Sequence, residues 1–232
     1  MVTSGISAYA GVENLEVMKE AENYNRFLIS LITPHLRRSA RVADFGAGTG
    51  TFVVPLHQQG VDVVAIEPDP ALEARLHRAG VKAYRDIAAL ADASLDLIYT
   101  FNVLEHIADD RAAIHVLARK LRSGGTLLVY VPAYQLLFTA MDRKVGHLRR
   151  YRRGGLSALV RGAGLHINAA RYADSLGFFA TLLYRALSAG DGSIDRRALR
   201  LYDRIVFPVS RLLDVALGRW LGKNLLLVAT KS

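Results

Sequence analysis

Three glycines at alternating positions form a loop that could approach a nucleotide closely. They are Gly46, Gly48 and Gly50 in the stretch VADFGAGTG, and they directly follow a short apolar run. A glycine turn between a strand and a helix brings backbone N–H groups and a helix N-terminus next to a ligand. The spacing is one residue tighter than the Gly-x-Gly-x-x-Gly pattern of dinucleotide sites. The loop therefore predicts a nucleotide site of another kind.

The carboxylate of Asp44, two residues before the first glycine, favours a cationic ligand. An acid at this position repels a pyrophosphate and attracts an ammonium group. S-adenosylmethionine carries an α-ammonium group and no phosphate. Asp44 therefore predicts this cofactor, with S-adenosylhomocysteine as the product, in preference to NAD.

Two more acids follow later strand-like segments. Glu67, in VVAIEPDP, could accept hydrogen bonds from both ribose hydroxyls, which would suit NAD equally. The alternative is an acid at a helix N-terminus, a role that Asp69 can fill alone. Asp86, in the stretch RDI, could accept a bond from an adenine amino group while Ile87 packs on the ring.

Apolar runs alternate with amphipathic segments around these residues, which predicts a parallel sheet with helices on both faces and right-handed crossovers. We expect strands over 40–45, 61–68, 81–86, 94–102, 124–133, 165–173 and 224–231. We expect helices over 51–59, 69–80 and 109–121, one near 155–164, and one that begins near Asn14 and ends at Pro34.

The chain is expected to be a single domain, 1–232, with four parts. They are an N-terminal helical cap (1–39), a cofactor-binding core (40–173), a helical insert or lid (174–222) and a final strand (223–232). The insert is apolar on one side and rich in arginine on the other. Such a segment can pack on the core, form a homodimer or contact a membrane surface.

Four stretches resemble, in order and spacing, the strand-end motifs of class I S-adenosylmethionine-dependent methyltransferases: VADFGAGTG, VVAIEPDP, SLDLIYTFNVLEHI and LRSGGTLLVYVPA. The resemblance implies an α/β, Rossmann-like fold with a seven-stranded sheet of order 3-2-1-4-5-7-6 and an antiparallel strand 7. It also implies these cofactor contacts: Asp44, Gly46, Ala47, Gly48 and Gly50 at the methionine end; Glu67 and Pro68 at the ribose; Asp86 and Ile87 at the adenine; and Phe101 and Asn102 beside the sulfonium. Tyr24 could close over the cofactor from the N-terminal helix, with simple helix packing as the alternative.

Methyl transfer from a sulfonium is a direct displacement, so positioning dominates, and a base is needed only where the acceptor loses a proton. Glu105 and His106, in VLEHI, could form such a base, or Glu105 could satisfy backbone at a helix start. Some quinone-type O-methyltransferases that resemble this stretch are linked to a divalent metal. Asn102 stands where a further acid would be needed, so no metal is expected.

The stretch DRKVGHLRRY resembles a motif of one methyltransferase subfamily, which also resembles this chain at NYNRFL. The resemblance implies that Asp142, His147, Arg150 and Tyr151 lie in the active site. The stretch follows the fifth strand, where such folds form the acceptor cleft. We therefore expect His147 and Tyr151 to border the acceptor cavity, although a lone histidine is more often structural.

Charge and composition restrict the possible partners and the cellular compartment. The net charge is +9, and residues 143–153 hold six Lys or Arg and no acid. This tract indicates a solvated surface or a docking surface for phosphates or acidic lipids. There is no cysteine, so disulfides and thiolate metal sites are excluded. No signal peptide and no span of about 20 apolar residues is recognisable, so we expect a cytoplasmic protein with at most peripheral membrane contact.

The leading hypothesis is methyl transfer to a small apolar or amphiphilic acceptor, such as a quinone-like, lipid-linked or secondary-metabolite ring. An RNA or protein methyltransferase that uses the basic tract is the first alternative. The tract holds one aromatic residue, too few for base stacking, so no nucleic acid partner is expected. A non-catalytic S-adenosylmethionine-binding module is the second alternative, and the intact glycines and acids argue against it.

Overall fold

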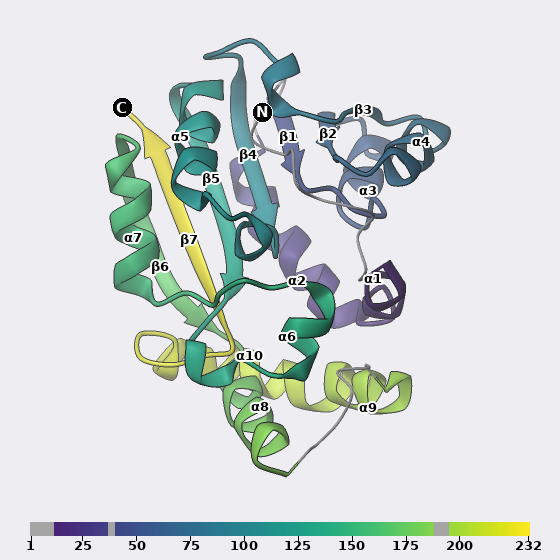
Figure 1. Ribbon diagram of the computed structural model, residues 1–232, viewed down its shortest axis with the longest axis vertical. Helices are drawn as coiled ribbons and strands as arrows, with labels where there is room; N and C mark the ends of the chain where they lie inside the picture. Colours follow the sequence, from purple (N-terminus) through teal and green to yellow (C-terminus); the bar gives the residue numbers. More distant parts are fainter. Residues whose placement is uncertain (1–11, 37–39, 188–194) are drawn as a thin grey trace.

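The computed structural model describes residues 12–36, 40–187 and 195–232, and a seven-stranded sheet lies at its centre (Figure 1). The strands are β1 (Arg41–Phe45), β2 (Asp62–Ile66), β3 (Lys82–Tyr84), β4 (Leu95–Phe101), β5 (Leu121–Pro132), β6 (Leu165–Ala173) and β7 (Asn224–Lys231). Their order is β3-β2-β1-β4-β5-β7-β6, and β7 runs antiparallel to both of its neighbours. The predicted order and the antiparallel last strand are confirmed.

Helices cover both faces of the sheet (Figure 1). One face packs against α5 (Asp110–Lys120) and α7 (Arg153–Gly162); the other packs against α2 (Glu22–Ile32), α3 (Val53–Gln58), α4 (Pro70–Arg78) and α10 (Phe207–Leu217). Successive residues of β5 alternate between the two cores, with Leu127 in the first and Leu128 in the second. This alternation follows from the two-residue period of a strand, and burial on both faces explains why the strands read as continuous apolar runs.

The N-terminal segment differs from the expected single helix. It forms α1 (Val12–Met18) and α2, followed by a 3-10 turn η1 (Thr33–His35) that contains Pro34. The break occurs because α2 is capped from far along the chain. Both carboxylate oxygens of Asp203 accept a backbone N–H at its start, from Asn23 and from Tyr24, each at 2.9 Å. These N–H groups have no partner within the helix, so the remote acid fixes where α2 begins.

The insert before β7 is helical, as expected. It contains α8 (Ser175–Leu187), α9 (Arg196–Leu201), the π-helical turn η5 (Tyr202–Val206) and α10. Its outer side exposes large apolar side chains, among them Phe179, Leu183, Leu212, Val215 and Trp220. The parts of the cap and insert at 1–11, 37–39 and 188–194 lie outside the described residues. Within the described chain no helix is long and apolar enough to span a membrane, and the homodimer and membrane contacts stay predictions.

The basic tract, residues 143–153, is partly helical and partly engaged in ion pairs. It begins inside α6 (Ala140–Val145), and two of its arginines are paired with acids. Arg149 Nη1 lies 3.0 Å from Asp110 Oδ2, and Arg150 Nε lies 2.8 Å from Asp142 Oδ1. The other short elements are the 3-10 turns η2 (Ile87–Ala89), η3 (Leu104–His106) and η4 (Gln135–Leu137).

Candidate functional site

A cavity of about 930 Å³ opens at the carboxyl edge of the parallel strands. Its lining includes the glycine loop after β1, the segments that follow β2 and β4, the loop after α6, and the insert. This edge is where open α/β sheets bind ligands. The volume lies at the upper end of the range of about 300–1,000 Å³ for a site that holds one drug-sized ligand.

Asp44 lies near the end of β1, inside this cavity, and is only 2% exposed. Its Oδ2 atom has no hydrogen-bond partner within the described part of the chain. Burial raises the pKa of Asp44 to about 8; the Tyr99 hydroxyl opposes this shift, and the Glu67 carboxylate adds to it. An unpaired buried carboxylate is costly, and a cationic ligand removes that cost.

The conformation and packing of the glycine loop require glycine. Gly46 has φ +86°, and a Cβ there would lie 2.3 Å from the Val103 side chain, so Val103 packs directly on the loop. Gly48 (φ +54°) donates its N–H to Glu67 Oε2 at 2.7 Å, and Asp69 N donates to Glu67 Oε1 at 3.0 Å. Glu67 therefore holds the loop as well as facing the cavity. Each of its oxygens keeps a lone pair for a ribose hydroxyl.

These groups fit S-adenosylmethionine. Asp44 and Glu67 are both buried and both line the cavity. The Lys and Arg side chains among the described lining residues belong to Arg150 and Lys223, which come from the loop after α6 and from the segment before β7, not from the glycine loop. The two carboxylates beside this loop can accept hydrogen bonds from an ammonium and from two ribose hydroxyls, and they disfavour a pyrophosphate. Asp44, Gly46, Gly48 and Glu67 are the residues that would hold the cofactor.

Most of the other predicted cofactor residues also line the cavity: Tyr24, Ala47, Pro68, Phe101 and Asn102. Tyr24 comes from α2, and its hydroxyl lies 3.5 Å from Asn102 Nδ2. Asn102 has a positive φ of 55°, a conformation that costs free energy in a non-glycine residue and is concentrated at functional sites.

Three predicted cofactor residues do not line the cavity. Asp86 caps the turn η2 by accepting the Ala88 N–H at 2.9 Å, and Ile87 is buried in the core at 1% exposure. Gly50 has φ +85° and serves packing, because a Cβ there would lie within 3.0 Å of Val54 and Leu76. The proposed adenine contacts of Asp86 and Ile87 therefore stay predictions without support from the cavity.

His147 is positioned by a buried network around Asp142. Asp142 closes a capping box with Thr139 at the start of α6, and Gly146 (φ +81°) ends that helix and turns the chain into His147. His147 Nδ1 lies 2.7 Å from Asp142 Oδ1, and Arg150 donates to both oxygens of Asp142 at 2.8 and 2.9 Å. Burial raises the pKa of Asp142, but the bonds from His147 and Arg150 outweigh burial and hold it well below its usual value.

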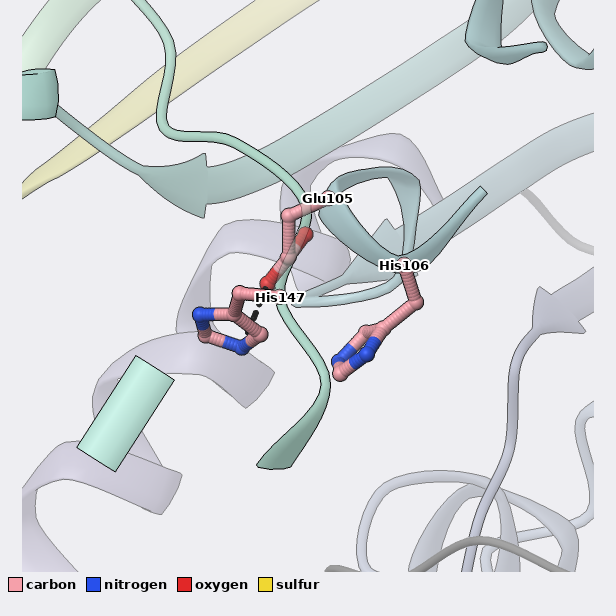
Figure 2. A group of neighbouring side chains, drawn as sticks. All are labelled: Glu105, His106 and His147. Carbon is pink, nitrogen blue, oxygen red and sulfur yellow. Dashed lines mark ion pairs between the residues drawn. The ribbon is translucent and has the colours of Figure 1, made fainter. Parts of the chain in front are cut away.

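Glu105 and His106 lie beside His147, as Figure 2 shows. Glu105 points from η3 toward His147, with Oε1 3.6 Å from His147 Nε2, and the two histidine rings meet edge to face at 4.6 Å between centroids. Burial is the main cause that raises the pKa of Glu105 to about 8 and lowers that of His106 to about 4. Both groups are therefore uncharged near neutral pH.

The same three side chains have the spacing of a metal site. One potential ligand atom from each of Glu105, His106 and His147 lies within 4.8 Å of the others. Sequence interpretation did not foresee this convergence, because His147 is 41 residues beyond His106 and comes from another segment. The expectation that no metal is used stays a prediction.

Tyr151 does not border the cavity, contrary to prediction. It is 5% exposed, and its hydroxyl lies 2.7 Å from Asp110 Oδ2 and 3.1 Å from the Leu104 carbonyl oxygen. Its backbone pairs with the end of β5 through a bridge to Ala133. The arginine-tyrosine end of the motif therefore ties the loop after α6 to η3 and α5.

The insert supplies lining residues that sequence reasoning missed: Asp174, Tyr202 and Phe207. Two more come from the start of the final strand: Lys223, directly before β7, and Asn224, its first residue. The Tyr24 ring packs edge to face against Phe207 at 5.5 Å, so α2 and the insert close this part of the cavity together. The periodicity of the insert indicated a helix and gave no sign of which residues face inward. Their placement depends on how the insert folds back on the sheet.

A sheet of this order, with a glycine loop after β1 and an acid before it, defines the class I methyltransferase fold. Residues 18–170 match the family described as methyltransferase domain, and the chain belongs to that family of S-adenosylmethionine-dependent methyltransferases. The ubiquinone biosynthesis O-methyltransferase of Xylella fastidiosa (strain 9a5c) is 32% identical over 151 residues, which cover 55% of this chain and 61% of the relative. The chain therefore matches less than two thirds of that relative's length.

Solved structures share the fold at low identity. A Thermotoga maritima S-adenosylmethionine-dependent methyltransferase, described as a possible histamine N-methyltransferase, superposes with a TM-score of 0.64 at 18% identity over 95% of both chains. Geranyl diphosphate C-methyltransferase from Streptomyces coelicolor A3(2), solved with S-adenosyl-L-homocysteine, gives 0.62 at 13% identity and covers 89% of this chain and 77% of that one.

Proposed function

We propose that the protein methylates a hydroxyl group of a small, apolar or amphiphilic ring compound and that His147 is the base. One observation carries the proposal: the glycine loop with Asp44 and the histidine held by Asp142 line the same cavity. The name of the Xylella relative, an O-methyltransferase of ubiquinone biosynthesis, supports a small hydroxylated acceptor. Arg149 and Arg150 are engaged with acids, which leaves less of the basic tract for nucleic acid.

S-adenosylmethionine, when bound, supplies a methyl group activated by its sulfonium. Asp142 accepts a hydrogen bond from His147 Nδ1–H, so the lone pair of the ring is on Nε2, 3.6 Å from Glu105 Oε1, and this lone pair takes the proton of an acceptor hydroxyl. The acceptor oxygen then forms its bond to the methyl carbon as the carbon–sulfur bond breaks. The ionised Asp142 stabilises the imidazolium, and the proton stays on Nε2 until it passes to solvent.

The residues around the cavity also exclude water from the reacting atoms. Tyr24 and Phe207 close the cavity from α2 and α10, and Asp203 fixes α2 to the insert through its two backbone bonds. Alignment of the reacting atoms in such a site can contribute about 7–11 kcal/mol. The chain's main catalytic contribution is therefore positioning, with proton transfer added by His147.

The test is transfer of labelled methyl from S-adenosylmethionine to a panel of catechols with and without alkyl tails, to total RNA and to denatured protein. We expect a catechol to be methylated, with and without a chelator, and His147→Gln to abolish most of the transfer. Methylation of RNA or protein instead would assign the function to the macromolecular alternative. S-adenosylhomocysteine binding with no transfer to any catechol would contradict the proposal and favour a binding module.

A further inference from the structure

Lys223 lies at the end of the cavity that is far from the glycine loop. It comes directly before β7, and the sheet order places β7 two strands beyond β4. Two strand spacings separate their ends by about 10 Å. Because β7 is antiparallel, its N-terminus meets the carboxyl edge where the parallel strands end. The lysine therefore lines the acceptor side of the cavity.

The backbone of Lys223 is fixed on both sides. Its carbonyl accepts the Ala133 N–H and its own N–H donates to the Asp174 carbonyl, each at 2.9 Å. The preceding Gly222 packs so closely that a Cβ would lie 2.4 Å from the Ala173 carbonyl oxygen. The side chain therefore extends into the cavity from a rigid junction between β5, β6 and β7, the kind of support that a binding group needs.

The ammonium of Lys223 makes no ion pair in the described part of the structure, whereas Arg150, the other Lys or Arg of the described lining, is paired with Asp142. The nearby Asp174 directs Oδ1 toward the insert, where it accepts hydrogen bonds from Tyr202 at 2.6 Å and Ser210 at 2.8 Å. Burial lowers the pKa of Lys223, with Asp174 opposing the shift. A half-buried, unpaired ammonium is costly, and a ligand anion offsets this cost.

We propose that Lys223 binds an anionic group of the methyl acceptor, a carboxylate or a phosphate, at a point remote from the atom that is methylated. The inference rests on the proposed function, because it places an acceptor between His147 and Lys223. It narrows the acceptor class to ring compounds that carry an acid as well as a hydroxyl group. The apolar walls hold the body of the molecule, and the lysine fixes its orientation.

The test compares acids with neutral partners of the same shape. Calorimetry on the protein saturated with S-adenosylhomocysteine would use 3,4-dihydroxybenzoate against 3,4-dihydroxybenzamide, phenyl phosphate against phenol, and decanoate against decanamide. We expect at least one acid to bind roughly tenfold or more tightly than its partner, the range of a charge-assisted bond. Lys223→Met and Lys223→Gln should remove this preference, and Lys223→Arg should retain most of it.

Three results would overturn the proposal. They are equal binding of every acid and its neutral partner, a preference that survives in Lys223→Met, and a loss of S-adenosylhomocysteine affinity in Lys223→Met, which would assign the lysine to the cofactor. Thermal unfolding of each variant checks that it is folded. Lys223-dependent binding of an acid without any methyl transfer would support this subsite and contradict the proposed function. Failure of the proposed function can therefore be told apart from failure of the lysine subsite.

Discussion

His147 Nδ1 lies 2.7 Å from Oδ1 of Asp142, a carboxylate that is completely buried. The same carboxylate caps α6 and forms a bidentate ion pair with Arg150. Asp142 therefore fixes a helix, a loop and an imidazole at once. Asp142 hydrogen-bonds to Nδ1 of His147, as the aspartate of a catalytic triad hydrogen-bonds to Nδ1 of its histidine.

His147→Gln and His147→Ala should lower turnover by about 10²–10⁴, the usual span for a general base. The glutamine amide can still donate a hydrogen bond to Asp142 but cannot accept the proton of the acceptor. Comparing His147→Gln with His147→Ala therefore distinguishes a loss of proton transfer from a loss of support for the loop. S-adenosylhomocysteine affinity, measured by calorimetry, should stay within about threefold, because His147 lies beyond the cofactor residues.

His106→Ala is the matched control for this prediction. Its pKa of about 4 makes His106 a weak base at neutral pH, so its loss should lower turnover less than the loss of His147. Full activity in His147→Gln, or a larger loss in His106→Ala, would reassign the base. Asp142→Asn is unsuitable as a probe, because leaving Arg150 with an unpaired buried charge should destabilise the fold by about 3–5 kcal/mol.

Glu105→Gln should stabilise the protein relative to wild type more at pH 8 than at pH 5. The folded-state pKa of Glu105 is raised to about 8 from its usual 4.5, so the folded state binds more protons than the unfolded state between these values. Stability of the wild type therefore falls as pH rises through this window, by at most about 1.4 kcal/mol per pH unit from this group. Denaturant unfolding at both pH values measures the difference, and an equal effect at pH 5 and pH 8 would show that Glu105 is ionised.

Glu67→Ala should weaken S-adenosylhomocysteine binding by about 1–3 kcal/mol, the range for lost hydrogen bonds to a charged group. It should also lower the unfolding temperature, because the Gly48 and Asp69 N–H groups lose their acceptor. Glu67→Gln keeps one acceptor oxygen, so its S-adenosylhomocysteine affinity and unfolding temperature should lie between those of the wild type and those of Glu67→Ala. Unchanged affinity in Glu67→Ala would limit the residue to holding the loop.

The cofactor half of the site could be predicted from sequence because its residues follow strand ends at fixed offsets. Asp44 lies near the end of β1, the glycine loop follows β1 and Glu67 follows β2, so locating the strands locates these residues. His147, which its motif singled out, lines the cavity, and its contact with the acceptor stays a prediction. Tyr151 was misplaced because a motif does not say which of its side chains face inward.

The acceptor half depends on contacts between distant segments. Asp203 caps α2 from 180 residues away, and Lys223 reaches the cavity only because β7 turns back between β5 and β6. Glu105 and His147 converge from two loops that share no sequence pattern. Periodicity and local spacing carry no information about such pairings, so apart from His147 the residues of this half are identified only by the three-dimensional structure.

The central claim is that Asp44 faces a cationic cofactor, and titration with S-adenosylhomocysteine between pH 6 and pH 8 tests it most directly. The free carboxyl has a pKa of about 8, and a ligand ammonium selects its ionised form, so binding must release a proton below that pH. Wild-type affinity should rise with pH, by up to about tenfold per unit. In Asp44→Asn the affinity should be lower and this rise reduced. An equal pH dependence in the two proteins, or tighter binding of NAD than of S-adenosylhomocysteine, would contradict the account.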